Sequence, residues 1–372
     1  MRHTLFSRTH WYLIALMAML MISISASDSY AQSTRKGKNY LKKRSKVASR
    51  YTGGSMRFTK QKRYLSVGLS ANSLNYFGDL TPSTGRLSTD LSYTRPGFGL
   101  QGVYRFNPNL SFRSHLLWGR ISADDFESAD IFDESGKYRH LRNLHFRNDI
   151  YEIGFGVMYD IFPNYSSFLN RVPFTPYVVG GFSIFYHNPK AIAPEFDKNG
   201  QPLAEGGQWV ALRPLGTEGQ YSPHYDVKPY SLIQPSIQLG AGIRSRLSKR
   251  VDLEFEIIYR FIFTDYLDDV SGKFVDLGAL DSELAKAMSD RSRETNAAWS
   301  GSQRDLAYMQ ENIQSLYTYT SEYDGNTYTV FRGYGHEHPD NNRGFPGNDT
   351  FLQISLRFNY ILTGAFARAK YR

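Results

Sequence analysis

Hydrophobic and polar residues alternate along much of the chain between residues 64 and 362, in eight separate segments. In residues 253–264, for example, Leu, Phe, Ile and Tyr occupy every second position, and Glu and Arg fill most of the positions between them. Alternation with a period of two indicates β-strands with one apolar face. The eight segments begin near residues 65, 98, 110, 151, 177, 237, 253 and 352.

The apolar face of these segments carries large aromatic side chains, and the opposite face carries Gly, Ser, Gln, Glu and Arg. Most segments reach the roughly 9–11 residues that a tilted strand needs to cross a bilayer, whereas soluble strands average about 5–6. A membrane barrel has this polarity, with apolar residues toward lipid and polar residues toward the lumen. The pattern therefore predicts an all-β fold, an eight-stranded antiparallel transmembrane β-barrel over residues 64–362.

The predicted connections are about 19, 3, 25, 13, 42, 3 and 83 residues long. Outer-membrane barrels combine short periplasmic turns with long extracellular loops, so both chain termini are expected in the periplasm. The last extracellular loop spans about residues 267–349. Its stretch 277–316 is poor in Pro and Gly and predicts a helical insertion of one or two short surface helices.

Composition narrows the possible chemistry. Of the 372 residues, 15% are aromatic, 41% hydrophobic and 21% charged, which suits a folded protein. The chain has no cysteine, which excludes disulfides, thiolate metal sites and a cysteine nucleophile. No phosphate-binding loop, dinucleotide fingerprint or catalytic motif is present, so neither a cofactor nor an enzymatic activity is expected.

The N-terminus predicts a secretory signal peptide at residues 1–31, with two arginines before an apolar stretch and a small-residue cleavage site after it. A basic periplasmic arm follows at residues 32–63. Residues 35–63 hold 12 Lys or Arg and no acidic residue, whereas residues 64–372 hold 30 basic and 34 acidic residues. The short tail 363–372 is also expected to be periplasmic.

This charge distribution predicts an acidic partner, either lipid phosphates of the outer membrane or an acidic protein surface. Nucleic acid is not expected, because no aromatic residues interleave with the basic ones as a stacking surface requires. A solvated tail without a partner remains the alternative. The residues predicted to contact partner or lipid are Lys42, Lys43, Arg44 and Lys46 of the arm and Lys249 and Arg250 of a periplasmic turn.

An eight-stranded barrel is just wide enough for side chains to fill its interior, so an open channel is not expected. Charges inside it need partners, which predicts a buried network of ion pairs. The predicted members are Glu152, Glu254, Glu256, Arg113, Arg244, Arg260 and Arg357.

Three carboxylates, Asp265, Asp268 and Asp269, follow the seventh strand. They are weak candidates for calcium ligands, because their spacing does not match an EF-hand loop, and hydrogen bonds that order the loop are favoured. His336 and His338 near Asp340 are a further weak metal candidate.

Several strings resemble the PorG-like outer-membrane barrels of Bacteroidetes, which are associated with the type IX secretion system. The resemblance covers about residues 64–372 and implies a non-enzymatic outer-membrane component that docks periplasmic ring proteins of the PorK and PorN type. It provides no catalytic or cofactor residue. The strings are Asn75-Tyr76-Phe77-Gly78-Asp79-Leu80, Arg142-Asn143-Leu144-His145-Phe146, Ile150-Tyr151-Glu152, Tyr177-Val178-Val179-Gly180-Gly181, Pro214-Leu215-Gly216-Thr217-Glu218-Gly219-Gln220, Thr264-Asp265-Tyr266-Leu267-Asp268-Asp269-Val270-Ser271, Arg343-Gly344 and Asn348-Asp349.

Two other functions remain open from the sequence. One is a surface-exposed adhesion or ligand-binding barrel that acts through the loops at about 188–229 and 267–349. The other is an outer-membrane hydrolase with a His and a Ser or Asp near the outer rim.

Overall fold

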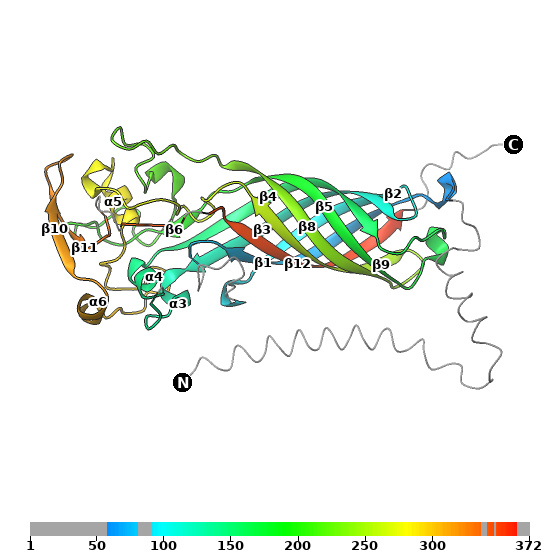
Figure 1. Cartoon of the computed structure of the whole chain (residues 1–372), viewed down its shortest axis with the longest axis horizontal. Coiled ribbons are helices and arrows are strands. Elements are labelled where there is room, and N and C mark those ends of the chain that lie inside the picture. The colour runs from blue at the N-terminus through cyan, green and yellow to red at the C-terminus, as the bar shows by residue number, and fades with distance from the viewer. Residues whose placement is uncertain (1–57, 81–90, 135, 336–340, 346, 363–372) are drawn as a thin grey trace. The chain divides into compact units, whose positions relative to one another are not determined.

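A computed structural model describes residues 58–80, 91–134, 136–335, 341–345 and 347–362. Within them, eight long antiparallel strands form one sheet, and the pairing of β1 with β12, the first and last of these strands, closes that sheet into a barrel (Figure 1). This confirms the predicted eight-stranded fold. The barrel strands are β1 (Tyr64–Phe77), β2 (Arg95–Arg105), β3 (Leu110–Asp124), β4 (His145–Asp160), β5 (Phe174–Tyr186), β8 (Ile233–Arg246), β9 (Val251–Ile262) and β12 (Thr350–Leu362).

The two faces of the barrel wall have the polarity that the alternation predicts. Outward side chains such as Leu69 and Phe98 are 68% and 61% exposed, whereas Ser70 and Gln101 on the same two strands are buried inside. Large apolar side chains leave water only if another apolar medium covers them, and a continuous band around a barrel suits lipid. The fold therefore has the architecture of an outer-membrane barrel.

Short and long connections lie at opposite ends of the barrel (Figure 1). Residues 106–109, 161–173 and 247–250 form the short-turn end. The described parts of segments 78–94, 125–144, 187–232 and 263–349 form the other end, which we call the cap. The alternation of connection lengths thus corresponds to a physical separation of two ends.

The cap contains secondary structure of its own. Asp124, Ser282 and Asp305 cap three of its α-helices by accepting from N–H groups of the first turn. The Ser282 hydroxyl, for example, accepts from the Ala285 amide at 3.1 Å. No helix among the described residues is long and apolar enough to cross a membrane. The cap elements are η2 (Leu91–Tyr93), α3 (Asp125–Ser128), α4 (Gly136–Arg142), β6 (Lys190–Ile192), β7 (Trp209–Ala211), η4 (Arg213–Leu215), η5 (Leu277–Ala279), α5 (Glu283–Ser289), α6 (Leu306–Asn312), β10 (Leu316–Thr320) and β11 (Thr327–Phe331).

The two short helices predicted in the last loop are α5 and α6, but α5 is not a surface helix. Ala285 and Met288 of α5 are buried in two hydrophobic clusters of the cap. On α6, by contrast, only Met309 is buried. The prediction of surface helices was wrong for α5, because the long loops fold against one another and build a core that sequence periodicity does not reveal.

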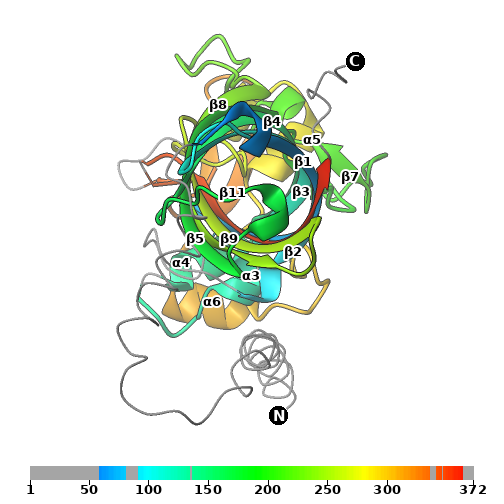
Figure 2. The ribbon, with the colours of Figure 1, turned by 90° about the vertical axis from the view of Figure 1, so that its right-hand side faces the viewer.

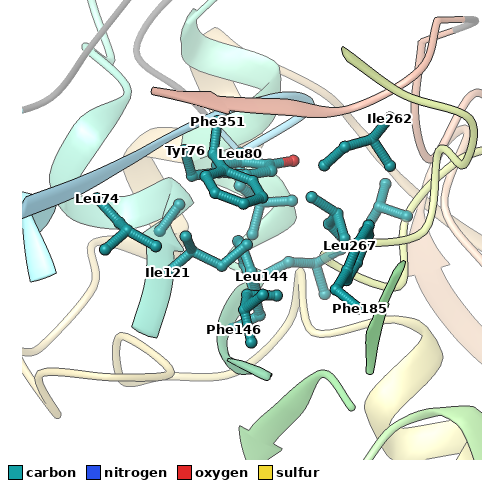
Figure 3. Close-up of a cluster of buried hydrophobic side chains, with 13 residues drawn as sticks. Leu74, Tyr76, Leu80, Ile121, Leu144, Phe146, Phe185, Ile262, Leu267 and Phe351 are labelled. Carbon is teal, nitrogen blue, oxygen red and sulfur yellow. The ribbon is translucent and has the colours of Figure 1, made fainter. Parts of the chain in front are cut away.

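A hydrophobic cluster closes the cap end of the barrel (Figure 3). We call it the mouth plug. Its side chains come from six of the eight barrel strands and from the loop segments next to them, and the labelled rings and aliphatic chains point toward one another. Its members are Leu74, Tyr76, Leu80, Ile121, Ala123, Leu144, Phe146, Ile150, Phe185, Ile262, Leu267, Val270 and Phe351.

The segment 161–173, which includes η3 (Phe168–Asn170), holds the turns of the short-turn end together (Figure 2). The Arg105 guanidinium donates to the Asn164 carbonyl at 2.9 Å. From the same segment, the Arg171 guanidinium donates to the Lys249 carbonyl at 2.9 Å and to Asp252 at 2.7 Å. These bonds join the segment to β2 and to the β8–β9 turn, so this end is also filled by protein. The remaining short helix, η1 (Lys60–Lys62), precedes β1.

We expect Phe155→Arg, which places a charge on the outward face of β4, to destabilise the barrel by about 2–4 kcal/mol in a bilayer. Urea unfolding in lipid vesicles, followed by the change in electrophoretic mobility, measures this effect. The matched control is Phe132→Arg, because Phe132 is 81% exposed on the cap. Equal destabilisation by both variants would show that lipid does not cover the outer face of β4.

Candidate functional site: the lumen and the mouth junction

One group of ion pairs in the lumen joins β3, β8, β9 and β12. Arg113 on β3 binds both carboxylate oxygens of Glu256 on β9, at 2.8 and 2.9 Å. The Arg357 guanidinium on β12 bridges Glu254 and Glu256 at 3.1 and 3.2 Å. Arg244 on β8 adds a contact of 2.8 Å to Glu254. These strands meet across the interior because their polar positions all face inward.

A second group lies on the inward faces of β3, β4 and β9. Arg260 binds Glu152 through two parallel hydrogen bonds of 2.8 Å. The imidazole Nε2 of His115 lies 2.7 Å from the same carboxylate. The structure thus brings all seven residues of the predicted network into ion pairs, and it adds His115 as a further member.

Apolar side chains share the interior with these charges. Val103, Met158, Tyr177, Val179 and Ile258 form a buried cluster, and the Tyr177 hydroxyl donates to Glu256 at 2.9 Å. The interior is therefore less uniformly polar than the alternation suggests. Side chains fill the middle of the lumen, and the mouth plug and segment 161–173 cover its two ends. This arrangement suits a closed barrel better than a channel.

The cap is attached to the barrel through a set of buried polar residues that we call the mouth junction: Tyr76, Asp79, Arg142, Glu218, Asp268, Asp269, Arg343 and Asp349. Glu218 is a centre of this junction. It accepts from Arg343 at 3.1 Å and from the backbone amides of Ser271 and Gly272 at 3.0 and 3.2 Å. A single carboxylate thereby ties three distant loop segments together.

Asp269 has an unusual backbone, with a φ of 71° that non-glycine residues rarely adopt. Its carboxylate accepts from the Thr217 hydroxyl at 2.6 Å and the Tyr230 hydroxyl at 2.7 Å. Arg343 lies 3.8 Å away. Burial raises the pKa of Asp269 to about 6, although the Arg343 charge opposes this rise. The hydrogen bonds offset the cost of the strained backbone and fix the loop.

Tyr76 joins two buried carboxyl groups. Its hydroxyl lies 2.6 Å from Asp268 Oδ2 and 2.9 Å from Asp349 Oδ1, and it accepts the Asp79 amide at 3.1 Å. A phenol has only one proton to donate, so the second carboxyl contact requires a proton on one of the acids. Burial, followed by the neighbouring Asp charges, raises the pKa of both Asp268 and Asp349 well above the usual range. A Cβ at Gly78 would lie 1.9 Å from both the Tyr76 hydroxyl and Asp349 Oδ1, so this tight cluster requires glycine there.

Two buried arginines extend the junction into the cap. Arg142 binds Asp125 through two hydrogen bonds of 2.7 and 2.8 Å and donates to the Asp79 and Arg343 carbonyls. Arg304 donates to the backbone carbonyls of Leu141 and Glu294 at 2.8 and 2.9 Å. Each guanidinium thus stabilises contacts between loops that start from different strands.

The remaining predicted site residues do not gather at one place. Asp265 accepts from the Ser271 hydroxyl at 2.8 Å, while Asp268 and Asp269 bind the separate partners given above. In the part of the chain that the structure describes, no three His, Asp or Glu side chains form a group that could hold a metal ion. Lys249 and Arg250 lie exposed in the turn at the opposite end of the barrel. Lys42, Lys43, Arg44, Lys46, His336, His338 and Asp340 lie outside the described residues.

Sequence reasoning missed the mouth junction as a unit. Its members are spread from residue 76 to residue 349 and follow no periodic pattern. The sequence feature that pointed to all of these residues was the set of strings that carry the family resemblance. Tyr76, Asp79, Arg142, Glu218, Asp268, Asp269, Arg343 and Asp349 all belong to those strings, although nothing in the sequence says that the strings meet.

Comparisons with known proteins give few further constraints. The family model described as a domain of unknown function (DUF6089) matches residues 55–203. No curated protein matches the chain. The fold therefore rests on the strand pairing described above.

Solved structures with some similarity are outer-membrane or surface proteins. Neisserial surface protein A is 10% identical with a TM-score of 0.33, covering 80% of this chain and 96% of that one. Ail of Yersinia pestis, in complex with the heparin analogue sucrose octasulfate, is 9% identical with a TM-score of 0.32, covering 81% and 99%. A major outer membrane protein from Thermus thermophilus is 12% identical with a TM-score of 0.34, covering 80% and 99%.

We expect Glu256→Gln to destabilise the barrel by about 3–5 kcal/mol, because it removes the carboxylate that pairs with Arg113 and one of the two that pair with Arg357 in the lumen. The free energy of unfolding by urea in lipid vesicles tests this. Glu127→Gln, at an exposed position of α3, should change it by less than about 0.5 kcal/mol. A loss equally small for Glu256→Gln would mean that water solvates these arginines.

The mouth junction should loosen as pH rises. Burial raises the pKa of Asp79 to about 7 and lifts those of Asp268 and Asp349 well above the usual value of about 3.9. Between about pH 4 and pH 7 the folded state therefore holds more protons than the unfolded state, so stability falls with rising pH. Hydrogen exchange of residues 264–272, corrected for the intrinsic pH dependence of exchange, should speed up across this range.

Asp268→Asn replaces one of the two buried acids at Tyr76 with an amide that does not titrate, so this pH dependence should become weaker. The control Asp226→Asn changes an exposed carboxyl of the cap and should leave it intact. An unchanged pH dependence in Asp268→Asn would contradict a shared proton at Tyr76.

Proposed function

We propose that this protein is a non-enzymatic scaffold or accessory subunit of the type IX secretion system in the outer membrane. In this role the barrel anchors the protein, and the basic arm and periplasmic turns bind ring proteins of the PorK and PorN type. The single observation that carries the proposal is the filled lumen. A barrel without a conducting interior acts through the surfaces at its two ends.

The short-turn end supports a docking role. Lys249 and Arg250 are exposed, and the turn that holds them is braced by Arg171, which binds the Ser248 and Lys249 carbonyls and Asp252. A braced basic turn presents its charge with little loss of conformational freedom on binding. It would complement an acidic periplasmic protein surface.

The mouth junction supports the family assignment. Strings that resemble PorG-like barrels lie far apart in the chain, yet they supply every member of this one junction. Residues that depend on one another physically in this way are a more specific signature than isolated matches. The secretion role rests on that resemblance.

A second candidate function is ligand binding or adhesion at the cell surface. The observation that favours it is the folded cap, whose β10–β11 hairpin presents exposed Leu316 and Tyr317. A folded surface with exposed aromatic residues suits recognition of another molecule. This alternative requires the same membrane orientation, but the cap, rather than the short-turn end, would bind the partner.

Crosslinked pull-down of the tagged protein from outer membranes, with mass spectrometry of the captured proteins, tests the proposal. We expect ring proteins with the wild type and a loss on the order of tenfold with Lys249→Glu/Arg250→Glu. The matched control, Lys228→Glu/Arg332→Glu, reverses two exposed charges on the cap and should retain capture. Absence of every secretion component from the wild-type sample would contradict the scaffold role and favour the cap as the working surface.

A further inference from the structure

Three of the four tryptophans of this chain line one small cleft at the rim of the barrel. Trp118 lies on β3, Trp209 on β7 and Trp299 in the last loop. The Trp209 and Trp299 rings meet edge to face at 5.5 Å, and Trp118 stacks on Phe98 at 6.0 Å. The cleft has a volume of about 160 Å³ and is also lined by Arg95, Pro96, Arg120 and Arg147.

The charges on the β3 and β4 side of this cleft are unbalanced. Arg120 is paired with Asp149 at 2.7 Å, whereas Arg147 forms no ion pair within the described part of the chain. Two guanidinium groups beside one carboxylate leave a net positive charge of about one, which attracts an anion. The Arg95 guanidinium also lines the cleft and donates to the Ser92 carbonyl at 3.1 Å.

Arg147 gives the second indication of a ligand. Its guanidinium lies over the Trp209 ring, 3.9 Å from the ring centre. Its Nε is buried and has no hydrogen-bond acceptor among the described residues. A buried donor without a partner is costly, and an acceptor entering the cleft would remove that cost.

The cleft lies directly beside the lipid-facing band. The exposed apolar side chains Leu100, Leu116 and Ile153 of the neighbouring strands belong to this band. At the edge of the band nearer the cap, Trp118 of β3 pairs with Tyr151 of β4. Two residues further toward the cap, on the same face of the sheet, Arg120 pairs with Asp149. Tryptophan and arginine at this level are typical of the interface between hydrocarbon and headgroups.

We propose that this cleft binds the phosphorylated sugar headgroup of a lipid in the outer leaflet. The planar guanidinium of Arg147 would donate to the phosphate, and the tryptophan rings would cover the apolar faces of the sugar. At about 30 Å³ per water molecule, the cleft holds the equivalent of about five waters, which suits one phosphate and its ester linkage. The inference rests on the proposed outer-membrane location but not on the secretion role.

Intrinsic fluorescence of the full mature chain in detergent tests this directly, because residues 32–372 have no tryptophan outside the cleft. The micelles would be doped with diphosphorylated lipid A or with a neutral glycolipid. We expect a saturable fluorescence change with lipid A and binding weaker by about tenfold or more with the neutral lipid. Equal responses to both lipids would overturn the phosphate assignment.

Arg147→Gln should weaken lipid A binding by about tenfold, whereas the exposed cap variant Arg332→Gln should bind as the wild type does. The change in electrophoretic mobility on heating verifies that both variants form the barrel. Full affinity in Arg147→Gln would overturn the proposal.

Free glucosamine 1-phosphate distinguishes a membrane lipid from a soluble ligand. We expect it to compete on the order of a hundredfold more weakly than lipid A, because it lacks acyl chains that lie against the apolar band. Competition at equal concentration would overturn the assignment to a lipid. Loss of ring-protein capture with intact lipid A binding would instead contradict only the secretion role.

Discussion

The pairing of charges inside the barrel is the constraint on which the rest of the structure depends. A wall that shows apolar side chains to lipid has to turn its polar residues inward, where little water is present to solvate them. Arg113, Arg244, Arg260 and Arg357 are each matched by a glutamate from another strand. The ion pairs of the lumen therefore form only when the strands pair in the correct register. A slip of one residue would place these charges in lipid.

Filling the lumen shifts the functional surface to the two ends of the barrel. At the cap, loops that are long enough to be disordered instead share a core and are held to the barrel by the mouth junction. At the other end, the bridging segment 161–173 holds the turns in place. The wall between them has one specialised place, the tryptophan-lined cleft, where the cap meets the lipid-facing band.

Alternation in the sequence was sufficient to predict the strands and which side chains point inward. It did not give the pairing of Arg113 with Glu256, which depends on barrel shear and on residues 143 positions apart. The structure of the cap was even harder to predict from the sequence, because contacts such as that of Arg304 with the Leu141 carbonyl follow no periodic pattern. Trp118, Trp209 and Trp299 come from three separate segments, so their convergence appears only in three dimensions. The buried face of α5 was missed for the same reason.

The mouth plug has a consequence for the order of folding. It contains Tyr76 and Phe351, which lie opposite each other where the first barrel strand pairs with the last. These two residues are 275 positions apart in the chain and meet only when the sheet closes. The mouth plug therefore cannot be completed on an open sheet, because its contact between Tyr76 and Phe351 needs the pairing of β1 with β12. A complete mouth plug thus marks a chain in which the first and last barrel strands have paired.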